Sequence, residues 1–116
     1  MRILLFAGAV AVAFCCTAHA FNPGLDEIFL RGDANNDTHI DVADPIFINA
    51  WLFSGGTTPP CVSAADANDD GGIDTADVSY LLNFLYLGGP APPSPYPGCG
   101  NDYTEDELSC VISACS

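Results

Sequence analysis

The chain has 116 residues and carries 15 Asp and Glu against 2 Lys and Arg, which gives a formal net charge of −13 at pH 7. Nucleic acid and anionic membrane surfaces are therefore excluded as expected partners, because nothing on the chain offsets phosphate repulsion. Cations are the partners that this composition favours.

The first 20 residues have the pattern of a cleaved secretory signal peptide. Arg2 is followed by an apolar run over residues 3–16, and Ala18-His19-Ala20 places small residues where the cleavage site is expected. A membrane anchor is the alternative, but the run is shorter than the roughly 20 residues of a spanning helix. The two cysteines that end the run suggest lipidation, although neither follows the small residue that a lipobox requires. We therefore expect residues 1–20 to be a signal peptide, no membrane insertion, and a mature chain that is secreted or held at the cell surface.

Four cysteines follow residue 20, and their even number in an exported chain predicts two disulfides. A small, highly charged domain buries only a modest core and needs such cross-links. Four cysteines allow three pairings, of which we favour Cys61–Cys99 and Cys110–Cys115, because the first pair brackets the second of the two repeats described below. A zinc site is the alternative, but neither the cysteine spacing nor His39, the one histidine after residue 20, supports it.

After a lead-in at residues 21–30, the sequence DANNDTHIDVAD at residues 33–44 returns as DANDDGGIDTAD at residues 66–77. The match continues beyond these twelve residues with a period of 33, and it defines two repeats at residues 31–60 and 64–93. A fixed period of this length indicates one supersecondary unit that is written twice.

Each repeat predicts a loop, a helix and a stop, in that order. Asp41 and Asp74 stand where helix N-caps belong, and double glycines followed by prolines end both helices. Apolar residues recur between these signals at helical spacing: Phe47, Ile48, Trp51 and Leu52 in the first repeat, and Tyr80, Leu81, Phe84 and Leu85 in the second. We therefore expect an all-α fold in which the two loop–helix units pack antiparallel and bury both apolar stripes, with loop-rich termini.

Both loops place side-chain oxygens at positions 1, 3, 5, 9 and 12, counted from the first Asp. This spacing matches the EF-hand calcium loop, in which position 7 adds a backbone carbonyl and position 9 often acts through water. Calcium takes about six to eight oxygen ligands, and alternate residues of a tight loop supply them. The predicted ligands are Asp33, Asn35, Asp37, His39, Asp41 and Asp44 in the first loop, and Asp66, Asn68, Asp70, Gly72, Asp74 and Asp77 in the second, with His39 and Gly72 using their carbonyls.

Two features depart from the EF-hand pattern. Position 12 is Asp rather than Glu, so its bidentate reach is shorter. Position 6 is Gly71 in the second loop but Thr38 in the first, where the sharp turn requires a positive φ that is costly for a β-branched residue. We therefore expect the second loop to bind calcium more tightly than the first.

Two DxNxDxxIDxxD loops spaced 33 residues apart, each followed directly by an apolar helix, resemble the type I dockerin repeat pair. Pro59-Pro60-Cys61 precedes the second loop, so we expect no helix to enter it. On this resemblance the dockerin-like repeat pair occupies residues 31–98, and a cysteine-containing tail follows at residues 99–116.

The resemblance implies a non-catalytic module that folds on two calcium ions and docks onto a cohesin domain. Such modules attach an enzyme, typically a glycoside hydrolase, to a scaffold or surface in polysaccharide-degrading assemblies. Loop positions 10 and 11 help to choose the partner, and a basic pair often lies five residues after position 12, where this chain has no Lys or Arg. The residues that correspond to this partner surface are Val42, Ala43, Asn49, Ala50, Thr75, Ala76, Leu82 and Asn83.

Other functional interpretations have less support. Two carboxylates could act as a glycosidase acid and base, but acids are so frequent here that any spacing occurs, so we expect no enzyme and no small-molecule substrate. The tripeptide Arg31-Gly32-Asp33 spells an adhesion motif, yet Asp33 is an expected calcium ligand. A calcium-stabilised spacer or surface protein without a cohesin partner is the main alternative, and a calcium buffer or sensor is a weaker one.

Two further local patterns make predictions. The residues Thr104 to Glu107 resemble a capping box that opens a short helix. Leu82, Tyr86 and Leu87 exceed what one core stripe needs, which suggests an exposed apolar patch, and packing of these side chains on the C-terminal tail is the alternative.

Overall fold

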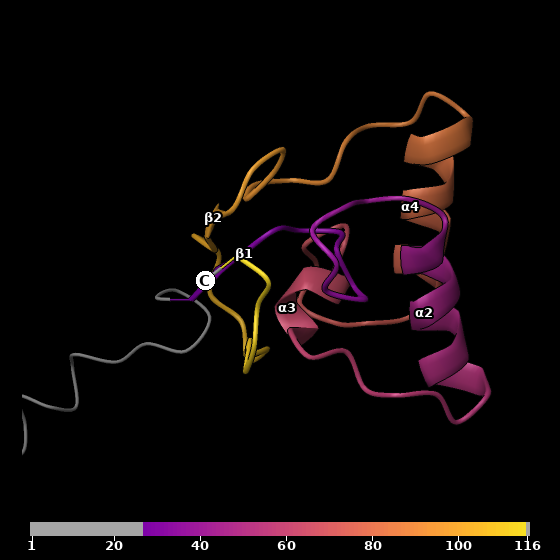
Figure 1. Cartoon of the computed structure of the whole chain (residues 1–116). Coiled ribbons are helices and arrows are strands. Elements are labelled where there is room, and N and C mark those ends of the chain that lie inside the picture. Colours follow the sequence, from indigo (N-terminus) through magenta and orange to yellow (C-terminus); the bar gives the residue numbers. More distant parts are fainter. Residues whose placement is uncertain (1–26, 116) are drawn as a thin grey trace, which may run out of the picture.

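The computed structural model describes residues 27–115, in which three helices are combined with one two-stranded sheet (Figure 1). The strands β1, Ile28–Phe29, and β2, Gly100–Asn101, pair antiparallel, with Phe29 opposite Gly100. The predicted signal peptide and most of the predicted lead-in lie outside the described residues. Within residues 27–115, no helix has the length and apolarity that crossing a membrane requires.

Two helices follow the acidic loops directly, as the repeat predicts. They are α2, Ala43–Phe53, and α4, Thr75–Tyr86, which pack against each other. Figure 1 shows them side by side at one end of the molecule, running in opposite directions, with α3 and the strands at the other end. The equivalent residues Ile48 and Leu81 are both fully buried, because each apolar stripe covers the other. The mainly helical character is confirmed, whereas the small sheet was not predicted.

The starts of these two helices differ by one residue. Asp74 caps α4 in a capping box, in which it accepts from Ala76 N while Asp77 accepts from Asp74 N. In α2 the N-cap is assigned to Val42, which makes no side-chain cap, but Asp41 makes the capping contacts expected of it, because it accepts from Ala43 N and its own N–H donates to Asp44. Val42 has helical angles, φ −64° and ψ −19°, which suit the first helical residue after a cap at Asp41, so both helices begin with equivalent capping contacts.

A short third helix enters the second loop. This helix, α3, spans Val62–Ala65 and is followed directly by Asp66. Our expectation that no helix enters this loop is wrong, because the prolines at 59 and 60 lie ahead of α3, where they remove none of its hydrogen bonds. Ala64 and Ala65 are buried, so α3 adds to the core beneath the loop.

The disulfides join Cys61 to Cys110 and Cys99 to Cys115. The favoured pairing, Cys61–Cys99 with Cys110–Cys115, is therefore wrong. The reason is a reversal of the tail, which runs antiparallel to the segment before α3 in an isolated β-bridge. Ser63 N donates to the Ser109 carbonyl at 3.2 Å, and Ile112 N donates to the Pro60 carbonyl at 3.3 Å. This reversal brings Cys110, and not Cys99, to Cys61.

The predicted capping box at Thr104 to Glu107 opens no helix. Thr104 Oγ1 instead lies 2.6 Å from Asp102 Oδ1 and 2.8 Å from Asp69 Oδ1, so its hydroxyl serves tertiary contacts. Asp106 Oδ1 accepts a hydrogen bond from Leu108 N at 2.9 Å, which closes a local turn. Side chains of this kind compete with helical backbone bonds, and here the turn is formed.

Arg31 lies fully buried between the second loop and the tail. Its guanidinium donates to the carbonyls of Ser94 at 3.0 Å and Asp66 at 2.9 Å. It also pairs with Asp69 at 3.4 Å and Asp102 at 3.1 Å. A side chain held in this way is not available for adhesion, so the tripeptide at residues 31–33 has a structural role.

Candidate metal centre

Each acidic loop gathers three carboxylates whose ligand atoms all lie within 4.8 Å of one another. They come from positions 1, 5 and 12 of the predicted calcium loop. Positions 1 and 12 are buried, and position 5 is exposed. The triads are Asp33, Asp37 and Asp44 in the first loop, and Asp66, Asp70 and Asp77 in the second.

The same backbone hydrogen bonds shape both loops. The position 1 carboxylate accepts from positions 5 and 6, position 12 accepts from positions 3 and 9, and position 5 accepts from position 7. In the first loop these bonds run from Asp37 N and Thr38 N to Asp33 (3.0 and 2.8 Å), from Asn35 N and Asp41 N to Asp44 (3.2 and 2.9 Å), and from His39 N to Asp37 (2.9 Å). In the second loop they run from Asp70 N and Gly71 N to Asp66 (3.1 and 2.9 Å), from Asn68 N and Asp74 N to Asp77 (3.3 and 2.9 Å), and from Gly72 N to Asp70 (3.1 Å). The repeated sequence therefore produces a repeated geometry.

Burial raises the pKa of the carboxyl groups at positions 1 and 12 of both loops. The pKa of Asp44 and that of Asp66 are raised to about 7, mainly by burial and also by neighbouring carboxylates, against the opposing effect of backbone N–H bonds. Burial also raises the pKa of Asp33 and that of Asp77. At position 5 of the first loop the pKa of Asp37 is lowered, mainly by the hydrogen bond from the N–H of position 7. Three clustered carboxylates of this kind repel one another, and a divalent cation removes the repulsion.

One buried amide oxygen in each loop has no hydrogen-bond partner, which indicates whether the loops are suited to calcium. Asn35 Oδ1 and Asn68 Oδ1 occupy position 3 of the two loops, and both are buried without a hydrogen-bond partner. Buried polar atoms nearly always have a partner, so the same orphan in two equivalent places requires an explanation. Calcium accepts amide and carboxylate oxygens together, so the residues present fit this ion.

The remaining predicted ligands lie in the loops but outside the triads. The carboxylates of Asp41 and Asp74 accept hydrogen bonds from Ala43 N and Ala76 N, both at 2.9 Å, so position 9 holds the start of each helix. This placement suits a contact made through water. At position 7, His39 and Gly72 donate their N–H groups to position 5.

Position 6 has a positive φ in both loops, +74° for Thr38 and +89° for Gly71. Glycine adopts this conformation without penalty, whereas the Cβ of threonine makes it costly. The structure therefore contains the strain that the sequence predicts for the first loop.

The tail contributes to the surroundings of the second loop, which was not predicted from the sequence. Asp106 lies with Asp66 and Asp69, and their ligand atoms are within 4.8 Å of one another. Asp102 is fully buried and pairs with Arg31. No repeat or spacing in the sequence links these tail residues to the second loop. Pairing Cys61 with Cys110 would have placed the tail beside this loop, but the sequence did not favour that pairing.

The predicted partner surface is at least partly exposed at all eight positions. A shallow hollow of about 340 Å³ lies between α2 and α4, lined by Pro45, Ile46, Asn49, Val78 and Leu82. Leu82, Tyr86 and Leu87 are exposed, as the apolar-patch prediction requires. Apart from the buried Asp44 and Asp77, neither helix contains a charged residue.

A family profile described as the dockerin type I domain matches residues 31–86, which include both acidic loops and helices α2, α3 and α4. The strands and the C-terminal tail lie outside this match. No curated protein and no solved structure matches the chain.

Proposed function

Because residues 31–86 belong to the type I dockerin family, we propose that the protein is a calcium-binding docking module with one calcium ion in each loop. Calcium binding and cohesin docking are properties of this family, and its members are non-catalytic modules. The observation that carries the calcium proposal is the unpartnered Asn oxygen beside the carboxylate triad of each loop. Two ions would also remove four units of a net charge that stands at −13.

The proposed ligands are the side chains at positions 1, 3, 5 and 12, the carbonyls of His39 and Gly72, and Asp41 and Asp74 through water. The backbone N–H bonds already orient the carboxylates at positions 1, 5 and 12. Bound calcium would therefore fix the start of α2 through Asp44 and the start of α4 through Asp77. Folding and calcium binding would be coupled in this way.

We propose that the partner docks on the exposed face of α2 and α4. This face is free of charge on a strongly acidic chain, and it contains the hollow between the helices and the exposed side chains of Ile46 and Leu82. An uncharged apolar face of this kind is typical of a protein-binding surface. A cohesin-like domain is the proposed partner.

The proposed organisation is a signal peptide at residues 1–20, a lead-in at residues 21–30, the docking module at residues 31–98 and a tail at residues 99–116. Two disulfides suit an oxidising, extracellular compartment. An extracellular assembly that degrades polysaccharides is the setting that the family suggests.

The docking proposal is tested by surface plasmon resonance of residues 21–116 against a panel of cohesin domains, in calcium and in chelator. We expect calcium-dependent binding that Leu82→Asp abolishes. Val111→Asp is the matched control, because Val111 is 81% exposed on the tail. Equal loss in both variants, or no binding to any cohesin, would favour the calcium-stabilised spacer instead.

A further inference from the structure

The C-terminal tail contacts both acidic loops at the same loop position, the fourth. Ala114 N donates to Asn36 Oδ1 at 2.6 Å in the first loop, and Thr104 Oγ1 lies 2.8 Å from Asp69 Oδ1 in the second. Asn36 and Asp69 are equivalent in the repeat, and both have positive φ, +65° and +59°. The turn that leads to position 5 is therefore held from outside in each loop.

We propose that the tail, residues 99–115, positions both calcium loops, and that the two disulfides keep it in place, so that oxidation of the cysteines raises calcium affinity. This proposal rests on the calcium sites of the proposed function. It adds to them residues outside the segment that matches the dockerin family.

In the second loop the tail acts together with Arg31. The hydroxyl of Thr104 lies between Asp69 Oδ1 and Asp102 Oδ1, at 2.8 and 2.6 Å. Arg31 pairs with the same two carboxylates and donates to the Asp66 carbonyl at 2.9 Å. Positions 1 and 4 of this loop are thus connected to the tail through a charge-assisted network that centres on the buried Arg31 and Asp102.

In the first loop the contact is made at the end of the tail. Ala114 is the residue before Cys115, whose disulfide to Cys99 closes the tail into a ring with a sequence separation of 16. The contact from Ala114 N to Asn36 therefore depends on this disulfide.

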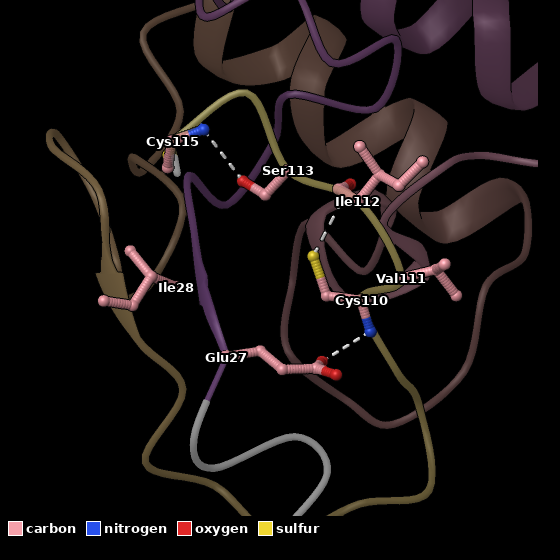
Figure 2. Close-up of a pocket in the computed structure, with 7 residues that line it drawn as sticks. All are labelled: Glu27, Ile28, Cys110, Val111, Ile112, Ser113 and Cys115. Atoms are coloured by element: carbon pink, nitrogen blue, oxygen red, sulfur yellow. Dashed lines mark hydrogen bonds between the residues drawn. The ribbon is translucent and has the colours of Figure 1, made fainter.

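The middle of the tail is anchored on Glu27, just before β1, and on the segment before α3. Figure 2 shows the carboxylate of Glu27 accepting a hydrogen bond from Cys110 N, beside a cavity of about 430 Å³ between Ile28 and the tail. The Cys61–Cys110 disulfide lies close to this contact and just before α3, which leads directly into Asp66. The disulfide therefore holds α3 in place at the start of the second loop.

Such anchors favour ion binding because a loop that is already ordered loses less conformational freedom when the ion arrives. Reduction of the disulfides releases the tail, and both left-handed turns at position 4 become free to relax. The two disulfides differ in what they hold: Cys99–Cys115 supports the first loop, and Cys61–Cys110 supports the second.

The test uses two single-loop backgrounds of the oxidised chain, residues 21–116. Asp44→Ala removes the first loop's position 12 ligand, and Asp77→Ala removes its equivalent in the second. Each background is titrated with calcium by calorimetry. If neither background nor the unmodified chain binds calcium, the proposed function fails and this inference fails with it, which is recognisable before any tail variant is measured.

Thr104→Val is then added to each background. We expect about a five-fold to ten-fold weaker calcium affinity where only the second loop remains, no change where only the first remains, and recovery with Thr104→Ser. The pair Cys99→Ser and Cys115→Ser should weaken the first loop more than the second, and the pair Cys61→Ser and Cys110→Ser the reverse. An equal loss in both backgrounds, which general destabilisation would produce, overturns the proposal, as does an unchanged affinity in all of them.

Discussion

The two acidic loops have the same ligand pattern and the same hydrogen bonds, yet their surroundings differ. The second loop has Gly71 at its sharp turn, α3 at its entry and the buried Arg31 against its backbone. The first loop has Thr38 at that turn, in an exposed position with φ +74°. The twelve residues of each loop therefore suffice to arrange the ligands, while the contacts around the loop determine how rigidly that arrangement is held.

Removing calcium is expected to have the largest effect, because it acts on both loops. A ligand that binds only the folded state at one hundred times its dissociation constant adds about 2.7 kcal/mol, so two independent ions add about 5 kcal/mol. Circular dichroism during thermal unfolding, with calcium and with chelator, measures this difference. An unchanged melting temperature would contradict the coupling of calcium binding to folding.

Arg31→Met is expected to have the next largest effect and to act on the second loop. It leaves Asp69 and Asp102 without their positive partner, and breaking a buried pair in this way costs about 3 kcal/mol. Calorimetry should show a weaker second site and a nearly unchanged first site. If both sites weaken equally, Arg31 supports the whole fold and not the second loop in particular.

Exchanging the residues at position 6 between the loops should reduce the difference in calcium affinity between the two sites. Thr38→Gly removes the strain of a β-branched residue at positive φ, which is about 1 kcal/mol, and should strengthen the first site by about five-fold. Gly71→Thr should weaken the second site by a similar factor. Affinities that do not move in these opposite directions would show that position 6 does not limit the first loop.

The smallest expected effect concerns the pH dependence of the folding stability of the metal-free chain, to which the two loops should contribute similarly. The folded-state pKa of Asp44 in the first loop and of Asp66 in the second are both raised to about 7, from an ordinary value of 3.8. A raised carboxyl pKa favours the folded state at low pH, and this contribution is lost as the pH rises from about 4 through about 7.

Urea unfolding in chelator should therefore show a metal-free form that is less stable at pH 8 than at pH 5. Asp44→Asn and Asp66→Asn should each reduce this dependence by a similar amount. Stability that rises over this range would contradict the assigned burial of these carboxyls.

The parts of the molecule that follow from the sequence are the local ones. The ligand spacing from Asp33 to Asp44 forms its loop through bonds between near neighbours, and the apolar spacing around Ile48 places that residue in the core. Both patterns involve residues that are close together in the sequence, so the sequence alone was sufficient to predict these features.

The parts that could not be predicted depend on distant segments. Cys61 pairs with Cys110 across 49 positions, and Thr104 reaches Asp69 across 35, because the tail reverses its direction. The pairing of Phe29 with Gly100 is equally remote. No periodicity indicates such contacts, so the part that the tail plays in the environment of the second loop was not predicted.

The most direct test of the account is a calorimetric calcium titration of the oxidised chain, residues 21–116. Two binding events are expected, of which Asp77→Ala removes the tighter and Asp44→Ala the weaker. Absence of calcium binding would contradict the assignment of both loops as calcium sites, and loss of the weaker event in Asp77→Ala would contradict the assigned difference between the loops.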